Sequence, residues 1–291
     1  MDILTNYTFQ IVALGSVLLA VAAAPVGAFS VYKGQSLIGD AIGHSTFPGI
    51  ILAYMAFATR SPVILLAGAI LAGAASYALI QLAHRDKRLG LDANLAIFLS
   101  GFFGLGMALK SFIQGNPDYA GASQAGLGTY IFGQAAYMLE ADVLLIAAIS
   151  ALVLTLLLLF YKELKLFVFD AEYAEVVGLP CRLLNLLLLV MTIAVIGIGI
   201  KAVGAILISS FLIIPCVAAN QWSNNFARVL LLSSLIGAVS ALIGTYISTL
   251  EQGMSTGPSI ILVTSLIAFF SIVFGTKGIL GSVLKRRRTH G

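Results

Sequence analysis

The chain has 291 residues, of which 60% are apolar and only 10% are charged, and its mean hydropathy is +1.04. Water-soluble domains carry roughly 25% charged residues, so this composition excludes a soluble globular protein. It is also too apolar for the alternating strands of an outer-membrane barrel. The composition therefore predicts an all-α, polytopic membrane protein, and the net charge of +4 is too small and too scattered to indicate nucleic-acid binding.

Apolar runs of about 20 residues, long enough to cross a bilayer, predict the spans. They lie at 9–31, 36–58, 62–83, 92–110, 142–161, 183–200, 202–219, 228–249 and 257–276. Nine is the literal count. Eight is the alternative, if the first run lies along the membrane surface or a later run is re-entrant. No linker or shift in composition divides the chain, which predicts a single domain over residues 1–291.

The basic residues predict the topology, because cytoplasmic loops of membrane proteins are enriched in lysine and arginine. All but three of the 16 basic residues fall on one side of the predicted spans, the exceptions being Arg60, Lys110 and Lys201. This pattern places the N-terminus outside and the C-terminus in the cytoplasm. The basic tail at 285–291 is most simply an anchor against anionic lipid.

Asp40 and His44 are the acidic residue and the histidine that fall well inside a predicted span. Residues four apart share one face of a helix. Ionisable side chains within a membrane are costly and usually mark a path for an ion or proton. A carboxylate favours hard cations such as Mn²⁺, and an imidazole also suits Zn²⁺ and Fe²⁺, so the pair is a plausible half-site for a divalent metal. The alternative is an Asp–His pair that bonds only to itself or to a neighbouring helix.

Two features near this pair bear on how a metal site would be completed. Pro48 has no N–H, so the carbonyl of His44 loses its usual helical donor and is free to face an ion. A divalent ion usually takes about six or more ligands, which one chain does not offer. We therefore expect a homodimer whose two-fold axis brings Asp40 and His44 of both protomers together. Gly39 and Gly43 are expected to let the two copies of this helix approach closely.

The loop at 162–182 contains a helix signal of its own. Asp170 is a good N-cap and Glu172 suits the first turn of a helix. Gly178 suits the C-terminal cap, with Pro180 just beyond it. These residues predict a short helix of about two turns. It either connects two spans without a further role, or it docks its acidic face and its apolar residues, which include Tyr173, onto a cytoplasmic motor domain.

A third pattern lies at 199–215, where small residues and Pro215 indicate a helix that packs closely and hinges, or one that only packs. Cys216 is either a soft metal ligand or inert packing. The chain has neither a P-loop nor a His-Glu-x-x-His pattern. We therefore expect no enzymatic site.

Three stretches, at 36–49, 169–180 and 201–215, resemble the signatures of one family. This family comprises the membrane permeases of bacterial ABC importers for manganese, zinc and ferrous iron. The resemblance runs in order from about residue 10 to 275. Gly43 stands where serine is common and Ala171 where proline is common, and neither change removes a candidate ligand. The turn at 256–258 resembles the form of the family that is associated with manganese and iron.

The resemblance implies a permease homodimer in the bacterial plasma membrane, with two cytoplasmic ATP-binding subunits and an extracytoplasmic metal-binding protein. It implies no permanently bound cofactor, and a transported ion that is Mn²⁺ or, alternatively, Zn²⁺ or Fe²⁺. Asp40 and His44 of both protomers match the family's transient ligands in the ion pathway. The residues that match its ATPase-coupling helix are Asp170, Glu172, Tyr173, Ala174, Glu175 and Gly178.

Two other functions compete with this one. A proton- or ion-coupled secondary transporter predicts internal inverted repeats and more buried carboxylates. The sequence shows one such carboxylate and no clear repeat. An ABC permease for a metal chelate shares the architecture, but its wide path would leave Asp40 and His44 with little purpose.

Overall fold

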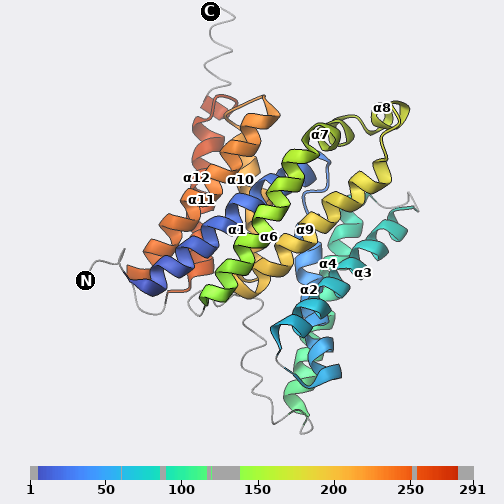
Figure 1. The fold of residues 1–291 in the computed structure, drawn as a ribbon, viewed down its shortest axis with the longest axis vertical. Helices are drawn as coiled ribbons and strands as arrows, with labels where there is room; N and C mark the ends of the chain where they lie inside the picture. Colours follow the sequence, from blue (N-terminus) through green and yellow to red (C-terminus); the bar gives the residue numbers. More distant parts are fainter. Residues whose placement is uncertain are drawn as a thin grey trace, which may run out of the picture.

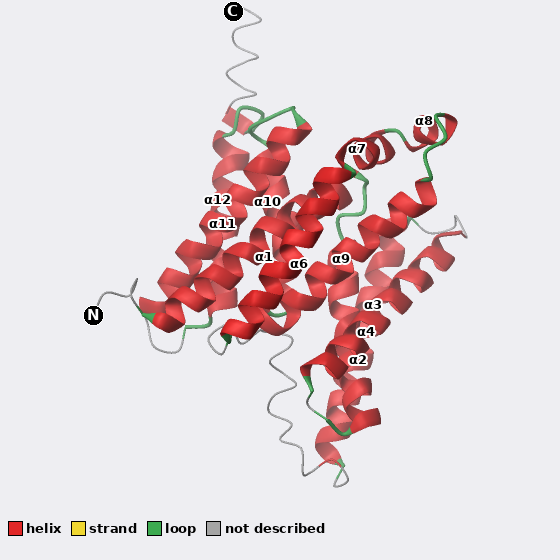
Figure 2. Cartoon of the chain, in the orientation of Figure 1, coloured by secondary structure: helices red, strands yellow, loops and turns green. Residues whose placement is uncertain are grey.

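The computed structural model describes residues 6–59, 61–85, 90–116, 119, 138–250 and 254–280. Over these residues the fold is helical and contains no strand, which confirms the all-α prediction (Figures 1 and 2). The helices are α1 (Tyr7–Tyr32), α2 (Ile38–Phe57), α3 (Pro62–Arg85), α4 (Leu91–Gly115), α6 (Glu140–Leu159), α7 (Tyr161–Phe169), α8 (Ala171–Val176), α9 (Cys181–Val203), α10 (Ala205–Asn220), α11 (Phe226–Leu250) and α12 (Thr256–Phe274).

The predicted apolar runs correspond to α1, α2, α3, α4, α6, α9, α10, α11 and α12. Within the described ranges, seven of these helices are long and apolar enough to cross a membrane, namely α1, α3, α4, α6, α9, α11 and α12. The other two are α2, which has 20 residues but carries Asp40 and His44, and α10, which has only 16 residues. The prediction of a polytopic helical membrane protein is therefore confirmed.

The loop at 162–182 is more ordered than the sequence predicts. The span expected at 142–161 ends at Leu159, and a separate helix, α7, begins at Tyr161. This helix is amphipathic, because it buries Leu164 and Phe167 and exposes Lys165. Its charged residues lower the mean hydropathy below that of a span, which is why apolar runs alone do not reveal it.

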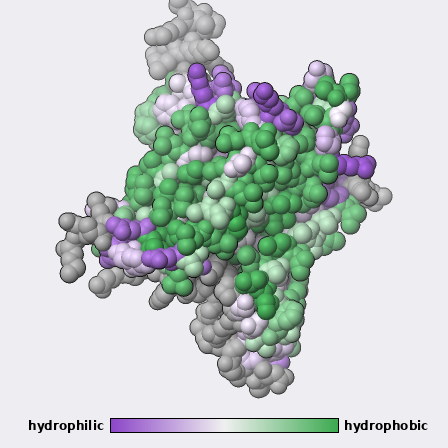
Figure 3. Space-filling view, viewed as in Figure 1, coloured by the Kyte–Doolittle hydropathy of each residue, from purple (hydrophilic) through white to green (hydrophobic). Residues whose placement is uncertain are grey.

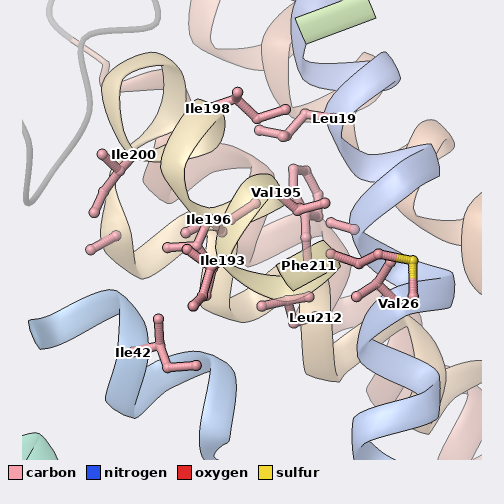
Figure 4. Packing of buried hydrophobic residues seen from close by; sticks show 14 of the residues in the cluster. Leu19, Val26, Ile42, Ile193, Val195, Ile196, Ile198, Ile200, Phe211 and Leu212 are labelled. Atoms are coloured by element: carbon pink, nitrogen blue, oxygen red, sulfur yellow. The ribbon is translucent and has the colours of Figure 1, made fainter. Parts of the chain in front are cut away.

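The core lies where α1, α2, α9 and α10 meet. Figure 4 shows apolar side chains of these helices pointing toward one another, among them Leu19, Ile42, Ile196 and Phe211, which are all fully buried. α1 carries the small residues Ala20, Ala22, Ala23 and Ala24 and contacts α6, α9, α10 and α11. Small residues let helix backbones approach closely, which favours van der Waals packing inside a membrane.

Two glycines allow the closest crossing between α2 and α3. A Cβ on Gly49 would lie 2.3 Å from the carbonyl oxygen of Gly68, and a Cβ on Gly68 would lie 2.5 Å from that of Gly49. Both contacts involve backbone atoms, so no side chain can rotate away to make room. The crossing therefore requires glycine on both helices.

Gly49→Ala is expected to force α2 and α3 apart and to lower the thermal stability of the protein in detergent. Overpacking a core costs about 1–3 kcal/mol, and more where the backbone itself must move. Gly101→Ala is the matched control, because a Cβ at Gly101 of α4 meets none of the described residues within 4 Å. Melting curves followed by size-exclusion chromatography measure the effect. Equal melting temperatures for the two variants would contradict the crossing.

One end of the helix bundle gathers several helix ends whose loops are basic. The hydroxyl of Tyr32, at the end of α1, donates to Asn220 Oδ1 at the end of α10 over 2.9 Å. Lys277, which follows α12, donates to the same oxygen over 3.2 Å. Phe226, at the start of α11, packs against Phe169 of α7 with ring centroids 5.1 Å apart. The ends of α1, α7, α10 and α12 and the start of α11 therefore lie together.

The start of α1 lies at the opposite end, where the Tyr7 hydroxyl donates to Glu140 of α6 over 2.5 Å. Figure 3 shows hydrophilic residues gathered at the ends of the molecule with an apolar band between them. This arrangement fits a bilayer around the apolar band, and the side of the membrane on which each terminus lies stays a prediction. The tail at 285–291 lies outside the described residues.

Candidate functional site

The structure brings Asp40 and His44 together on one face of α2. His44 Nε2 lies 3.3 Å from Asp40 Oδ1, and the two side chains are 18% and 28% exposed, respectively. Asp40 lies in the first turn of α2, where the helix dipole favours a negative charge. Phe103 of α4 packs edge-on against the His44 ring, with centroids 5.0 Å apart, and so fixes its orientation.

The pair lines an open hollow of about 340 Å³ between α2 and α10. Two further polar residues that line it, Ser209 and Ser210 of α10, were not singled out from the sequence. Their hydroxyls donate to the carbonyls of Ala205 and Ile206 over 3.0 Å and 2.8 Å. Each serine oxygen therefore keeps lone pairs that can accept or ligate. Serines often bond back to their own helix in this way, so the sequence carries no signal that distinguishes these two.

Gly39 and Gly43 do not have the role that the sequence predicts. A Cβ on Gly39 would lie 2.6 Å from Leu212 Cδ1, and a Cβ on Gly43 would lie 3.2 Å from Ser209 Oγ. Both glycines therefore seat α2 on α10 of the same chain, and the prediction that they join two subunits is wrong. A pair of small residues four apart indicates a close approach but not which helix approaches. The contact has a consequence for the site, because it sets Asp40 and His44 beside Ser209.

Pro48 lies inside α2, as the sequence predicts, and it cannot donate a hydrogen bond to the carbonyl of His44. In the part of the chain that the structure describes, no group of three or more His, Cys, Asp or Glu side chains lies close enough together to hold a metal. Cys216 is 1% exposed within the apolar core and does not line the hollow, which favours packing over ligation. One chain thus offers a carboxylate, an imidazole and hydroxyl oxygens, which is a weak and incomplete set.

The helix predicted in the loop is α8, and its two caps are those that the sequence predicts. Asp170 Oδ1 accepts a hydrogen bond from the backbone N–H of Tyr173 over 2.9 Å. The other end is closed at Gly178, which has a φ of +86°. Two backbone hydrogen bonds of 3.0 Å, made by Gly178 and Leu179, form the Schellman motif around it. These local bonds give α8 a fixed shape although it has only six residues.

The faces of α8 differ sharply in exposure. Ala174 is fully buried against the rest of the chain, so it seats the helix and is not open to a partner. The side chains of Tyr173 and Val176 are 55% and 84% exposed. We call the exposed face the α8 ridge, and it consists of Glu172, Tyr173, Glu175, Val176 and Val177. An exposed ridge that is both apolar and acidic is typical of a surface that binds a protein partner.

These features define a class of protein: a multi-pass helical membrane protein with a polar pair beside a hollow and a capped helix at one end. The chain belongs to the ABC 3 transport family, whose sequence model matches residues 5–275. This match confirms the family resemblance of the three sequence motifs.

Individual relatives agree with the family. The chain is 39% identical over 289 residues to the zinc transport system membrane protein TroC of Treponema pallidum, a match that covers 99% of this chain and 96% of that protein. It is 38% identical over 285 residues to the manganese transport system membrane protein MntC of Bacillus subtilis, covering 96% of this chain but 65% of that longer protein. Among solved structures, PsaBC from Streptococcus pneumoniae in complex with Fab superposes with a TM-score of 0.80 at 26% identity, over 94% of each chain.

Proposed function

We propose that the chain is the membrane permease of an ABC importer that moves a divalent transition metal ion into the cytoplasm, driven by ATP hydrolysis on a separate subunit. The observation that carries this proposal is the Asp40–His44 pair at the hollow between α2 and α10. A carboxylate and an imidazole suit a divalent transition metal. The relatives named as zinc and manganese transport proteins support the same class of cargo.

The pair binds the ion weakly and passes it on. A nitrogen of imidazole that ligates a metal carries no proton, so an ion that binds between Asp40 and His44 replaces their direct contact. The Asp40 carboxylate offsets part of the charge that the ion brings into a low-dielectric environment. The Ser209 and Ser210 hydroxyls replace some of its hydration oxygens. Transport requires binding that is strong enough to admit the ion and weak enough to release it.

A second protomer completes the ligand set in this proposal. Two copies around a two-fold axis offer two carboxylates, two imidazoles and the serine hydroxyls, which together approach the six or more ligands of a divalent ion. The α8 ridge of each protomer contacts one cytoplasmic ATP-binding subunit, and an extracytoplasmic protein delivers the metal. The capping bonds of α8 support this role, because a rigid helix transmits force better than a flexible loop.

The cargo we favour is Mn²⁺, with Zn²⁺ and Fe²⁺ as the alternatives. Oxygen ligands from Asp40, Ser209 and Ser210 outnumber the imidazole nitrogen, and oxygen favours the harder ion. Among the described residues that line the hollow there is no cysteine, whose thiolate a site for Cu⁺ would use.

Uptake by the reconstituted complex tests the proposal. The permease is purified with its ATP-binding subunits and binding protein and placed in lipid vesicles, and metal uptake is measured for Mn²⁺, Zn²⁺ and Fe²⁺ separately. We expect uptake of free metal ions that depends on ATP, with Mn²⁺ preferred. Uptake driven by a proton gradient without ATP would instead establish a secondary transporter, and uptake of chelated metal alone would establish a chelate permease.

A further inference from the structure

The turn between α1 and α2 is held by contacts that neither the hollow nor the α8 ridge explains. Lys33 Nζ donates a hydrogen bond to Asn185 Oδ1 of α9 and lies 4.8 Å from the centroid of the Phe167 ring of α7. Asn185 in turn donates through Nδ2 to the Tyr77 hydroxyl of α3 over 2.8 Å. One side chain in the turn thus joins α7 and α9, and through Asn185 it reaches α3.

The residue before Lys33 makes a parallel set of contacts with α7. The Tyr32 ring lies 5.3 Å from the ring of Phe169 and 5.0 Å from that of Phe226, measured between centroids. α7 therefore contacts the end of α1 and the residue after it: Phe167 lies against Lys33, and Phe169 lies against Tyr32. The next residue after Phe169 is Asp170, the N-cap of α8. Asp170 is the one residue between α7 and α8, so a movement of α8 is expected to move Phe167 and Phe169 as well.

The turn that starts at Lys33 has only five residues before α2 begins, and several of its backbone groups are hydrogen-bonded. Gly34 has a φ of +75°, and the N–H groups of Gly34 and Gln35 donate to the carbonyls of Val31 and Ser30 over 3.0 Å and 2.9 Å. The N–H of Ile38 donates to the Gln35 carbonyl over 3.1 Å, and there α2 begins. Asp40 follows in the first turn of α2. A displacement of Lys33 is therefore expected to reach Asp40 through this short, partly hydrogen-bonded turn.

The surroundings of Lys33 make its two contacts more important than those of an exposed lysine. Lys33 lies in the turn between α1 and α2, outside both helices. Burial lowers its pKa to about 8. Its contacts, an amide oxygen and the face of an aromatic ring, are uncharged groups that still favour a cation. Losing either contact would leave a partly buried ammonium poorly solvated. The Lys33 side chain is thus bound to follow Asn185 and Phe167 when they move.

We propose that Lys33 is a positioning residue that couples movement of α7 and α8 to the Asp40–His44 pair. When a partner displaces the α8 ridge, Phe167 and Asn185 shift Lys33, and the bonded turn carries the start of α2 with it. The hollow between α2 and α10 then changes shape, and the ligands of the ion change their separation. This inference rests on the proposed function, because it assigns to Lys33 a step in transport driven by ATP.

The transport test uses the complete complex in lipid vesicles and measures Mn²⁺ taken up per ATP hydrolysed. Lys33→Met is expected to lower this ratio at least about five-fold while ATP hydrolysis continues. A factor of about five is the lower end of the effect that coupled sites usually have on each other. Phe167→Leu, which keeps an apolar side chain, should lower it in the same direction. Lys33→Arg should restore most of the ratio, because a guanidinium also bonds to an amide and stacks on an aromatic ring. Lys165→Met removes an exposed charge from α7 and is the matched control.

A second measurement separates positioning from a merely structural role. Amide hydrogen exchange of residues 33–40 is compared with and without a non-hydrolysable ATP analogue in the assembled complex. In the wild type both this segment and residues 161–169 should respond to nucleotide, and in Lys33→Met only residues 161–169 should respond. A response at residues 33–40 that persists in Lys33→Met, or an unchanged transport ratio, would overturn the inference. If the wild type imports no metal ion, the proposed function fails and only the exchange measurement applies: a response at residues 33–40 that is lost in Lys33→Met still supports coupling of α7 to α2 through Lys33.

Discussion

Asp40→Asn is expected to abolish metal uptake while the permease still assembles with its partners. The asparagine has nearly the same size but no charge, so a divalent ion at the hollow loses its nearest counter-charge. Two unit charges about 4 Å apart near a protein surface interact by about 4 kcal/mol. Because Asp40 is 28% exposed, water screens part of this interaction, and we expect uptake to fall at least about a hundredfold, or about 2.7 kcal/mol. His44→Ala should have a similar effect through the loss of the imidazole ligand.

Asp92→Asn is the matched control for this experiment. Asp92 also lies in the first turn of a helix, α4, and it is exposed and does not line the hollow. Vesicle uptake measured by elemental analysis, with complex formation checked by size-exclusion chromatography, gives the result. Normal uptake by both Asp40→Asn and His44→Ala would show that the ion does not bind at the hollow during transport. If the site is shared between protomers, a complex with one variant copy should also lose most of its uptake.

Tyr173→Ala is expected to disconnect ATP hydrolysis from transport. Tyr173 exposes 55% of its surface on the α8 ridge, and an aromatic anchor at an interface typically contributes about 2 kcal/mol or more, which is about thirty-fold in affinity. We therefore expect weaker binding of the ATP-binding subunit and a loss of uptake that exceeds the loss of ATP hydrolysis. Glu172→Lys should act in the same direction by reversing a charge on the ridge.

Tyr7→Ala provides the comparison, because Tyr7 is 61% exposed at the opposite end of the bundle. The binding of each variant to the isolated ATP-binding subunit is measured by titration in detergent, alongside uptake in vesicles. A crosslinking map in which residues 170–178 stay free of the ATP-binding subunit would contradict the assignment of the ridge.

The features that the sequence predicts well are those decided by nearby residues. Apolar runs identify the long helices, and the caps at Asp170 and Gly178 identify α8, because each signal lies within a few residues of the structure it causes. Apolar runs do not predict α7, because charged residues alternate with apolar ones along it and it buries only Leu164 and Phe167. An amphipathic pattern in nine residues is too short to separate from a polar loop.

The parts of the site that depend on contacts between distant residues could not be predicted. Asp40 and His44 stand out in sequence because ionisable residues are rare in an apolar helix. Their neighbour Ser209 does not stand out, since its place at the hollow is decided by how Gly43 meets α10. The bond between Lys33 and Asn185 joins residues 152 positions apart, and nothing local to either residue indicates it.

The short length of α10 has a consequence for how this helix is placed in the membrane. Its 16 residues extend about 24 Å, whereas the apolar part of a bilayer is about 30 Å thick. The helix contacts α1, α2, α9, α11 and α12, so protein and not lipid covers much of it. Because these neighbours are longer helices, the ends of α10 face protein and need not reach both surfaces of the bilayer, so a helix shorter than a full span is accommodated beside the hollow.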